Sequence, residues 1–191
     1  MKKSEKQWFV GVILLIITVI LFIGLWKLDR NKAEAKPAPI IVDIQKQKYL
    51  SWMYKNSNES KRTLEEIYNI TSENINTRDL MLSLIAVESG FNPKAKSDKN
   101  AMCLTQVRPS VWLPELKKAG IIQDDRDLWD EDKCIAAGTY VFKHYLKKSN
   151  GNLKQALGSY VGAELNSKDA EVYVGRILTV LGELMLLKME V

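Results

Sequence analysis

Histidine is nearly absent from this sequence: His144 is the only one in 191 residues. A Ser-His-Asp triad depends on a histidine as its base, and a multi-histidine zinc site needs several. We therefore expect neither kind of site, and we interpret His144 as a solvated helix residue. The chain has no glycine-rich phosphate loop, and its acidic run at residues 124–127 lacks the ligand spacing of an EF-hand. The sequence thus predicts no metal and no cofactor.

The chain has a net charge of +5, but most of its length carries no excess of positive charge. Residues 1–39 hold seven basic and three acidic side chains, whereas residues 40–191 hold 21 and 20. The near-neutral larger part argues against a nucleic-acid partner, which would need clustered basic side chains. The basic residues near the N-terminus flank an apolar segment instead, a pattern that suits anionic lipid headgroups.

The apolar segment runs from Trp8 to Trp26 and reads WFVGVILLIITVILFIGLW, without a charged residue. It is long enough to span about 30 Å of hydrocarbon at about 1.5 Å per helical residue. Tryptophans at both ends are typical of the membrane interface. We expect residues 1–7 to form a short basic tail and residues 8–26 a single retained transmembrane helix. The alternative is a signal peptide cleaved near residues 33–35, but the apolar run is long for one.

The remainder of the chain predicts a linker followed by one domain. Residues 27–43 contain Pro37 and Pro39, which favour an extended tether. Residues 44–191 show helical periodicity and no clear strand alternation, so we expect a compact all-α domain. The helices are expected at residues 44–54, 61–71, 78–89, 110–118, 130–148, 153–160 and from 166 or 167 to about 189.

Two of these helices carry more specific expectations. In the helix at residues 130–148, Gly138 should allow another helix to approach closely. In the last helix, the side chains expected to face the core are Val172, Tyr173, Ile177, Val180, Leu181 and Leu184.

Glu88 stands near the end of the apolar run LMLSLIAVESGFNP, residues 80–93. Its neighbours one and two turns back along the helix are apolar: Ile85, Leu84 and Met81. Loss of solvation raises the pKa of a carboxyl group, and an acid that keeps its proton near neutral pH can donate it to a leaving group. The alternative is a surface glutamate in a frayed last turn, or one paired with a lysine such as Lys94 or Lys96.

The residues after Glu88 carry a family resemblance. The matching positions are Glu88-Ser89-Gly90-Phe91-Asn92-Pro93, Ala95, Ser97, Leu104, Gln106 and Pro109, with less specific matches at residues 127–130, 137–140 and 151–162. This pattern resembles the soluble lytic transglycosylase family, which is related to goose-type lysozyme, over about residues 77–177. The resemblance implies a lysozyme-like fold and peptidoglycan glycan strands as the substrate.

The resemblance also implies roles for individual residues. Glu88 would be the only catalytic acid/base, protonating the bond between N-acetylmuramic acid (MurNAc) and N-acetylglucosamine (GlcNAc). It would then take the proton of the muramoyl 6-hydroxyl, closing a 1,6-anhydro ring without the second carboxylate of ordinary glycosidases. Ser97 and Gln106 would hydrogen-bond the substrate, Tyr160 would position Glu88 and stabilise developing positive charge, and Tyr173 would line the cleft.

The sequence departs from the family pattern at several positions. Cys103 replaces a glycine, Thr105 and Arg108 replace methionines, and Val161 replaces an asparagine. Cys134 is a further departure from the family pattern, because it stands where the family tends to have asparagine. We predict a disulfide between these two cysteines, with two buried free thiols as the alternative. A disulfide would indicate an oxidising compartment.

Together these features predict a single-pass protein of the inner membrane, with its catalytic domain on the periplasmic side. Its partners would be peptidoglycan strands and the membrane, through residues 8–26. Two alternatives stay open: a hydrolase on the same fold, and an inactive wall-binding scaffold that kept the fold. Wall remodelling, an envelope-spanning apparatus, and phage lysis or entry are all compatible settings.

Overall fold

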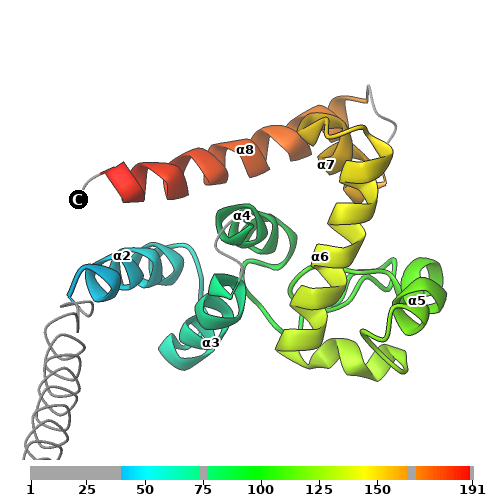
Figure 1. The fold of residues 1–191 in the computed structure, drawn as a ribbon, viewed down its shortest axis with the longest axis horizontal. Coiled ribbons are helices and arrows are strands. Elements are labelled where there is room, and N and C mark those ends of the chain that lie inside the picture. The colour runs from blue at the N-terminus through cyan, green and yellow to red at the C-terminus, as the bar shows by residue number, and fades with distance from the viewer. Residues whose placement is uncertain (1–39, 74–76, 163–166, 190–191) are drawn as a thin grey trace, which may run out of the picture. The chain divides into compact units, whose positions relative to one another are not determined.

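The computed structural model describes residues 40–73, 77–162 and 167–189 (Figure 1). The chain divides into one unit of residues 1–43 and a second of residues 44–191. The elements in chain order are α2 (Ile40–Lys55), α3 (Lys61–Ser72), α4 (Arg78–Ser89), α5 (Pro109–Lys118), the 3-10 helix η1 (Asp125–Trp129), α6 (Glu131–Lys148), α7 (Leu153–Val161) and α8 (Lys168–Met189).

The expected all-α architecture is confirmed for the described residues. α4 has the predicted bounds, and most other helices differ from prediction by one or two residues at an end. α2 begins at Ile40 rather than at residue 44, because Pro39 is the last helix breaker before it. The expected anchor at residues 8–26 lies outside the described residues. Among the helices that are described, none is both long and apolar enough to cross a membrane.

The central helix of this arrangement is α4, with α8 packed against it (Figure 1). Leu82 and Ile85 of α4 belong to one core cluster, shared with α2, α3, α5, α6 and the loop after α4. Leu84 belongs to a second cluster, shared with α6, α7 and α8. Because apolar side chains cover α4 on several sides, its last turn is held in a fixed place.

The last helix, α8, faces the core with a partly different set of residues than expected, because Ala170 and Val174 are also buried. Tyr173, Ile177 and Leu184 are buried as predicted, but Val172 is 54% exposed. The expected set spans too wide an arc for one helix face. Tyr173 takes the inward position next to Val172, because it packs in the second core cluster against α4 and α7.

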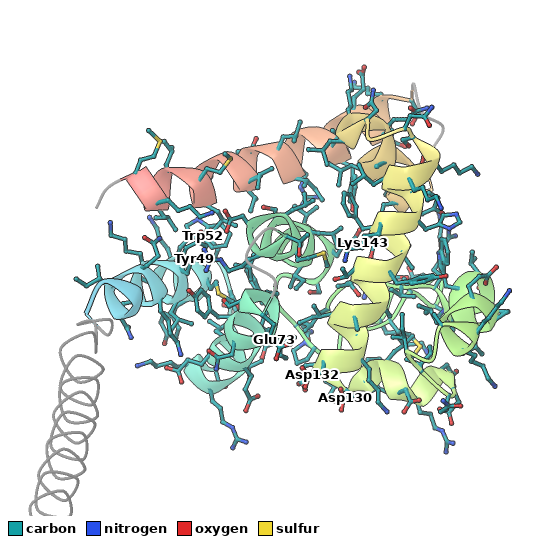
Figure 2. All side chains as sticks on the ribbon, viewed as in Figure 1. Tyr49, Trp52, Glu73, Asp130, Asp132 and Lys143 are labelled. Atoms are coloured by element: carbon teal, nitrogen blue, oxygen red, sulfur yellow. A yellow bond between two sulfur atoms is a disulfide. The ribbon has the colours of Figure 1, made fainter. Side chains whose placement is uncertain are left out.

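Two charged side chains are buried where α4 begins, and they connect four helices. The Tyr49 hydroxyl of α2 (Figure 2) donates to Oδ1 of Asp79 at 2.7 Å. Arg78 donates to Tyr49 at 3.2 Å and to Tyr68 of α3 at 3.3 Å, and Lys188 of α8 pairs with Asp79. Burial would raise the pKa of Asp79, but the bonds from Lys188 and Tyr49 outweigh it and hold the pKa below its ordinary value.

Replacing Asp79 by asparagine is expected to lower the free energy of unfolding at pH 7 by about 3–5 kcal/mol, because Arg78 is left buried without an anionic partner. Because the pKa of Asp79 is lowered in the folded state, its contribution to stability is fully present at neutral pH. That contribution is lost as the pH falls through the lowered pKa. The loss caused by Asp79→Asn should therefore shrink between pH 7 and pH 3, as measured by urea unfolding. The exposed Asp125→Asn variant serves as control, and an equal loss at both pH values would contradict the assignment.

Candidate active site

Glu88 lies in the last turn of α4, where the chain leaves the helix. Gly90 follows in the left-handed region at φ 60°, and its N–H bonds back to the Ala86 carbonyl to end the helix. The C-terminal end of a helix carries partial negative charge and so disfavours a carboxylate. The site thus begins with an acid placed where its ionised form is unfavourable.

Burial raises the pKa of Glu88 to about 7. This agrees with the expectation from its apolar helical neighbours. Two groups act in the opposite direction: the Tyr173 hydroxyl, which donates to Oε1 at 2.5 Å, and the positive charge of Arg176. Near neutral pH, both protonation states of Glu88 are therefore populated, as acid/base catalysis requires.

An open pocket of about 260 Å³ lies in front of Glu88. It is lined by Glu88, Ser97, Lys99, Ala101, Gln106, Arg108, Tyr160, Val161 and Gly162. Four of the predicted site residues therefore meet here: Glu88, Ser97, Gln106 and Tyr160. Tyr173 does not line the pocket but reaches the same place through its bond to Glu88.

The loop between α4 and α5 presents Ser97 and Gln106 to the pocket. Ser97 Oγ accepts the N–H of Ala101 at 3.0 Å, so its own hydroxyl hydrogen stays available for a ligand. The Gln106 amide nitrogen donates to the carbonyls of Ala95 and Cys103 at 3.2 and 3.0 Å. That bonding leaves the amide oxygen as an acceptor, so the two side chains offer one donor and one acceptor.

Cys103 in this loop is bonded to Cys134 of α6 in a disulfide, with Cα atoms 6.3 Å apart. Its backbone lies in the left-handed region, at φ 66°. That conformation costs a residue with a side chain about 1–2 kcal/mol, which explains why a glycine suits the position. Closing a loop of this length contributes about 3–4 kcal/mol in the chain-entropy model, enough to offset the strain.

Thr105 fills the space between the loop and α6. It is fully buried, and its hydroxyl donates to the Cys134 carbonyl at 3.0 Å. A Cβ atom at Gly138 would lie only 2.5 Å from the Thr105 Cβ. Gly138 does permit a close approach, but the approaching segment is this loop and not a helix as predicted.

The two tyrosines make different hydrogen bonds beside the pocket. Tyr160 donates to the Thr105 carbonyl at 2.8 Å, so it supports the loop and does not bond to the acid. Tyr173, expected only to line the cleft, makes the bond to Glu88. The reason is the packing of α8 against α4, which brings together residues 85 positions apart. Burial and the nearby Glu88 raise the pKa of both tyrosines, so both remain proton donors.

Two residues of the pocket were missed by sequence reasoning. Arg108 was noted only as a departure from the family pattern, and Lys99 was not considered. Both line the pocket with Glu88. The signal that could have found them is their spacing, because each lies two residues after a predicted substrate contact, Ser97 or Gln106.

Residues 65–177 match the family described as Transglycosylase SLT domain. The chain belongs to this family. The match contains Glu88, both tyrosines and both cysteines, whereas α2 lies outside it. Membership in the transglycosylase SLT family supports lytic transglycosylase activity on peptidoglycan in general and implies binding of its glycan strands.

Replacing Tyr173 by phenylalanine removes a hydrogen bond that favours ionised Glu88. The pKa of Glu88 should therefore rise above 7, by up to about one unit for a bond of this kind. Carbon NMR of protein labelled at the glutamate carboxyl groups measures this midpoint. Tyr54→Phe, at an exposed position on α2, is the matched control. An unchanged or lowered midpoint in Tyr173→Phe would rule out the proposed effect of the bond.

The backbone at Cys103 can be tested with two variants that both lack the disulfide. Cys103→Gly with Cys134→Ala should be more stable to urea than Cys103→Ala with Cys134→Ala, by about 1 kcal/mol, because glycine adopts the left-handed conformation without strain. Both should be less stable than the native protein by several kcal/mol. If the alanine variant is as stable as the glycine variant, the backbone at this position is not strained.

Proposed function

We propose that the protein is a membrane-anchored lytic transglycosylase that cleaves the MurNAc–GlcNAc bond of peptidoglycan and leaves a 1,6-anhydro-MurNAc end. The observation that carries this proposal is the environment of Glu88. Its carboxyl group has a pKa of about 7, and it is the only carboxyl group among the described residues that line the pocket.

In the first step, protonated Glu88 donates its proton to the glycosidic oxygen. The bond from this oxygen to the muramoyl C1 breaks, the GlcNAc side leaves with a hydroxyl group, and positive charge develops at C1. Glu88, now ionised, accepts the proton of the muramoyl 6-hydroxyl as its oxygen bonds to C1. The proton returns to Glu88 and no water is consumed. A pKa near neutral pH suits a group that acts as acid and then as base.

The lining of the pocket favours this route over ordinary hydrolysis. Most glycosidases use two carboxyl groups, one as acid and one as base or nucleophile. The pocket offers only Glu88 among its described residues, so a hydroxyl of the substrate is the better nucleophile. The Ser97 hydroxyl and the Gln106 amide oxygen are placed to hold sugar hydroxyl or acetamido groups beside Glu88.

We further propose that residues 8–26 anchor the protein in the inner membrane, with residues 27–39 as a tether to the catalytic domain on the periplasmic side. The apolar run with tryptophans at both ends supports the anchor. The Cys103–Cys134 disulfide supports an oxidising compartment, which is also where peptidoglycan lies.

Glu88→Gln is expected to reduce release of soluble fragments from purified peptidoglycan by about 10²–10⁴-fold, because glutamine cannot exchange the proton. Glutamine keeps an oxygen that can accept the bond from Tyr173, so the fold should be retained. Glu115→Gln, on the exposed side of α5, is the control and should stay active. Mass spectrometry of the native digest should show muramoyl ends one water lighter than hydrolytic ends.

The two readouts separate the two parts of the proposal. Equal activity of Glu88→Gln and native protein would overturn the assignment of Glu88. Products that carry the added water would overturn ring closure and show a hydrolase, while leaving Glu88 as its acid.

A further inference from the structure

The pocket in front of Glu88 carries two positive side chains that the proposed chemistry does not use. Lys99 comes from the loop after α4, and Arg108 is the N-cap residue of α5. Glu88 is the only acidic side chain among the described residues of the lining, and its pKa is about 7. The described part of the lining therefore carries more positive than negative charge at neutral pH, whereas residues 40–191 as a whole are almost neutral.

Arg108 is held in place by the end of α7. Gly162 ends that helix in the left-handed region, at φ 71°. A Cβ atom at Gly162 would lie 2.9 Å from Nη2 of Arg108, so the guanidinium group rests against a backbone that has no side chain there. Arg108 is also half-buried. A guanidinium placed in this way has its planar fork of donors partly oriented before any ligand arrives.

Neither cation is matched by an acid of the described chain. Within residues 40–73, 77–162 and 167–189, no ion pair or side-chain hydrogen bond involves Lys99 or Arg108. Other cations do have such partners: Arg78 pairs with Asp79, Arg126 with Asp124 and Lys133 with Asp127. Asp98 precedes Lys99 but does not line the pocket.

The ligand for such a pair of cations is an anion, and a carboxylate matches the guanidinium fork. The sugar rings of a peptidoglycan strand are neutral. Negative charge enters through the lactyl group on O3 of each muramoyl residue. That group ends in a free carboxylate where the peptide has been removed, and elsewhere it carries a stem peptide with carboxylates of its own.

We propose that Lys99 and Arg108 bind a carboxylate on the lactyl branch of a muramoyl residue next to the cleaved bond. This inference rests on the proposed function, because it assigns a substrate group to the same pocket. It makes the two residues determinants of specificity, which select muramoyl strands over neutral chitin-type chains. Glu88 still supplies the chemistry.

Binding is measured with full-length protein in neutral detergent, on a Glu88→Gln background that prevents turnover. The probes are peptide-free glycan strands, peptide-bearing strands and neutral chitin oligosaccharides. Adding Arg108→Gln should weaken binding of a muramoyl probe by about tenfold or more, as expected for loss of a charged hydrogen bond, and should reduce its salt dependence. Lys99→Gln should have a smaller effect, because this side chain is exposed. Arg108→Lys should restore part of the loss.

The matched control is Lys117→Gln, which removes an exposed cation of α5 that is not part of the pocket lining. It should leave the binding of every probe unchanged. Chitin binding should be unaffected in all variants. In the active protein, Arg108→Gln should raise KM for muramoyl strands and leave kcat nearly unchanged.

The three probes also identify the source of the carboxylate. A loss confined to peptide-free strands assigns the lactyl carboxylate itself, and a loss confined to peptide-bearing strands assigns the stem peptide. An equal loss on chitin, or no loss on any probe, would overturn the proposal. If the native protein proved inactive, the proposed function would fail, but the binding comparison would still give its own answer.

Discussion

The hydrogen bond between Tyr173 and Glu88 is the contact on which the site depends. A half-buried carboxyl group at the end of a helix needs a partner that fixes its direction without forcing it to ionise, and a tyrosine hydroxyl meets both needs. The bond exists because α8 packs against α4, and α4 keeps its place because core residues cover it on several sides. The geometry around Glu88 is therefore set by helix packing as well as by the residues next to it in the sequence.

The sequence predicted the helices well because their signals are local. Breakers such as Gly90 mark their ends, and the apolar periodicity of α4 was enough to suggest a raised pKa for Glu88. It did not predict which hydrogen bonds the two tyrosines make, because the direction of each hydroxyl depends on how α7 and α8 pack. The partner of Gly138 was missed for the same reason, since Thr105 reaches it from a distant loop.

The departures from the family pattern fall into two groups in space. Cys103 and Thr105 are buried and face α6, so they change how the loop is supported. Arg108 and Val161 line the pocket, so they change what a bound strand meets. The residues that change the support of the loop are thus different from the residues that change the pocket lining. Neither Glu88 nor its hydrogen-bond partner Tyr173 is among the residues that depart from the pattern.

The left-handed backbone at Cys103 also limits the order in which the two cysteines can be acquired during evolution. A lone cysteine at position 134 would be a small buried residue on a helix and nearly neutral. A lone cysteine at position 103 would add strain with no bridge to offset it. Acquiring Cys134 first is therefore the more accessible path. Once the bridge has formed, losing Cys134 alone exposes the strain at Cys103, so the pair resists stepwise reversal.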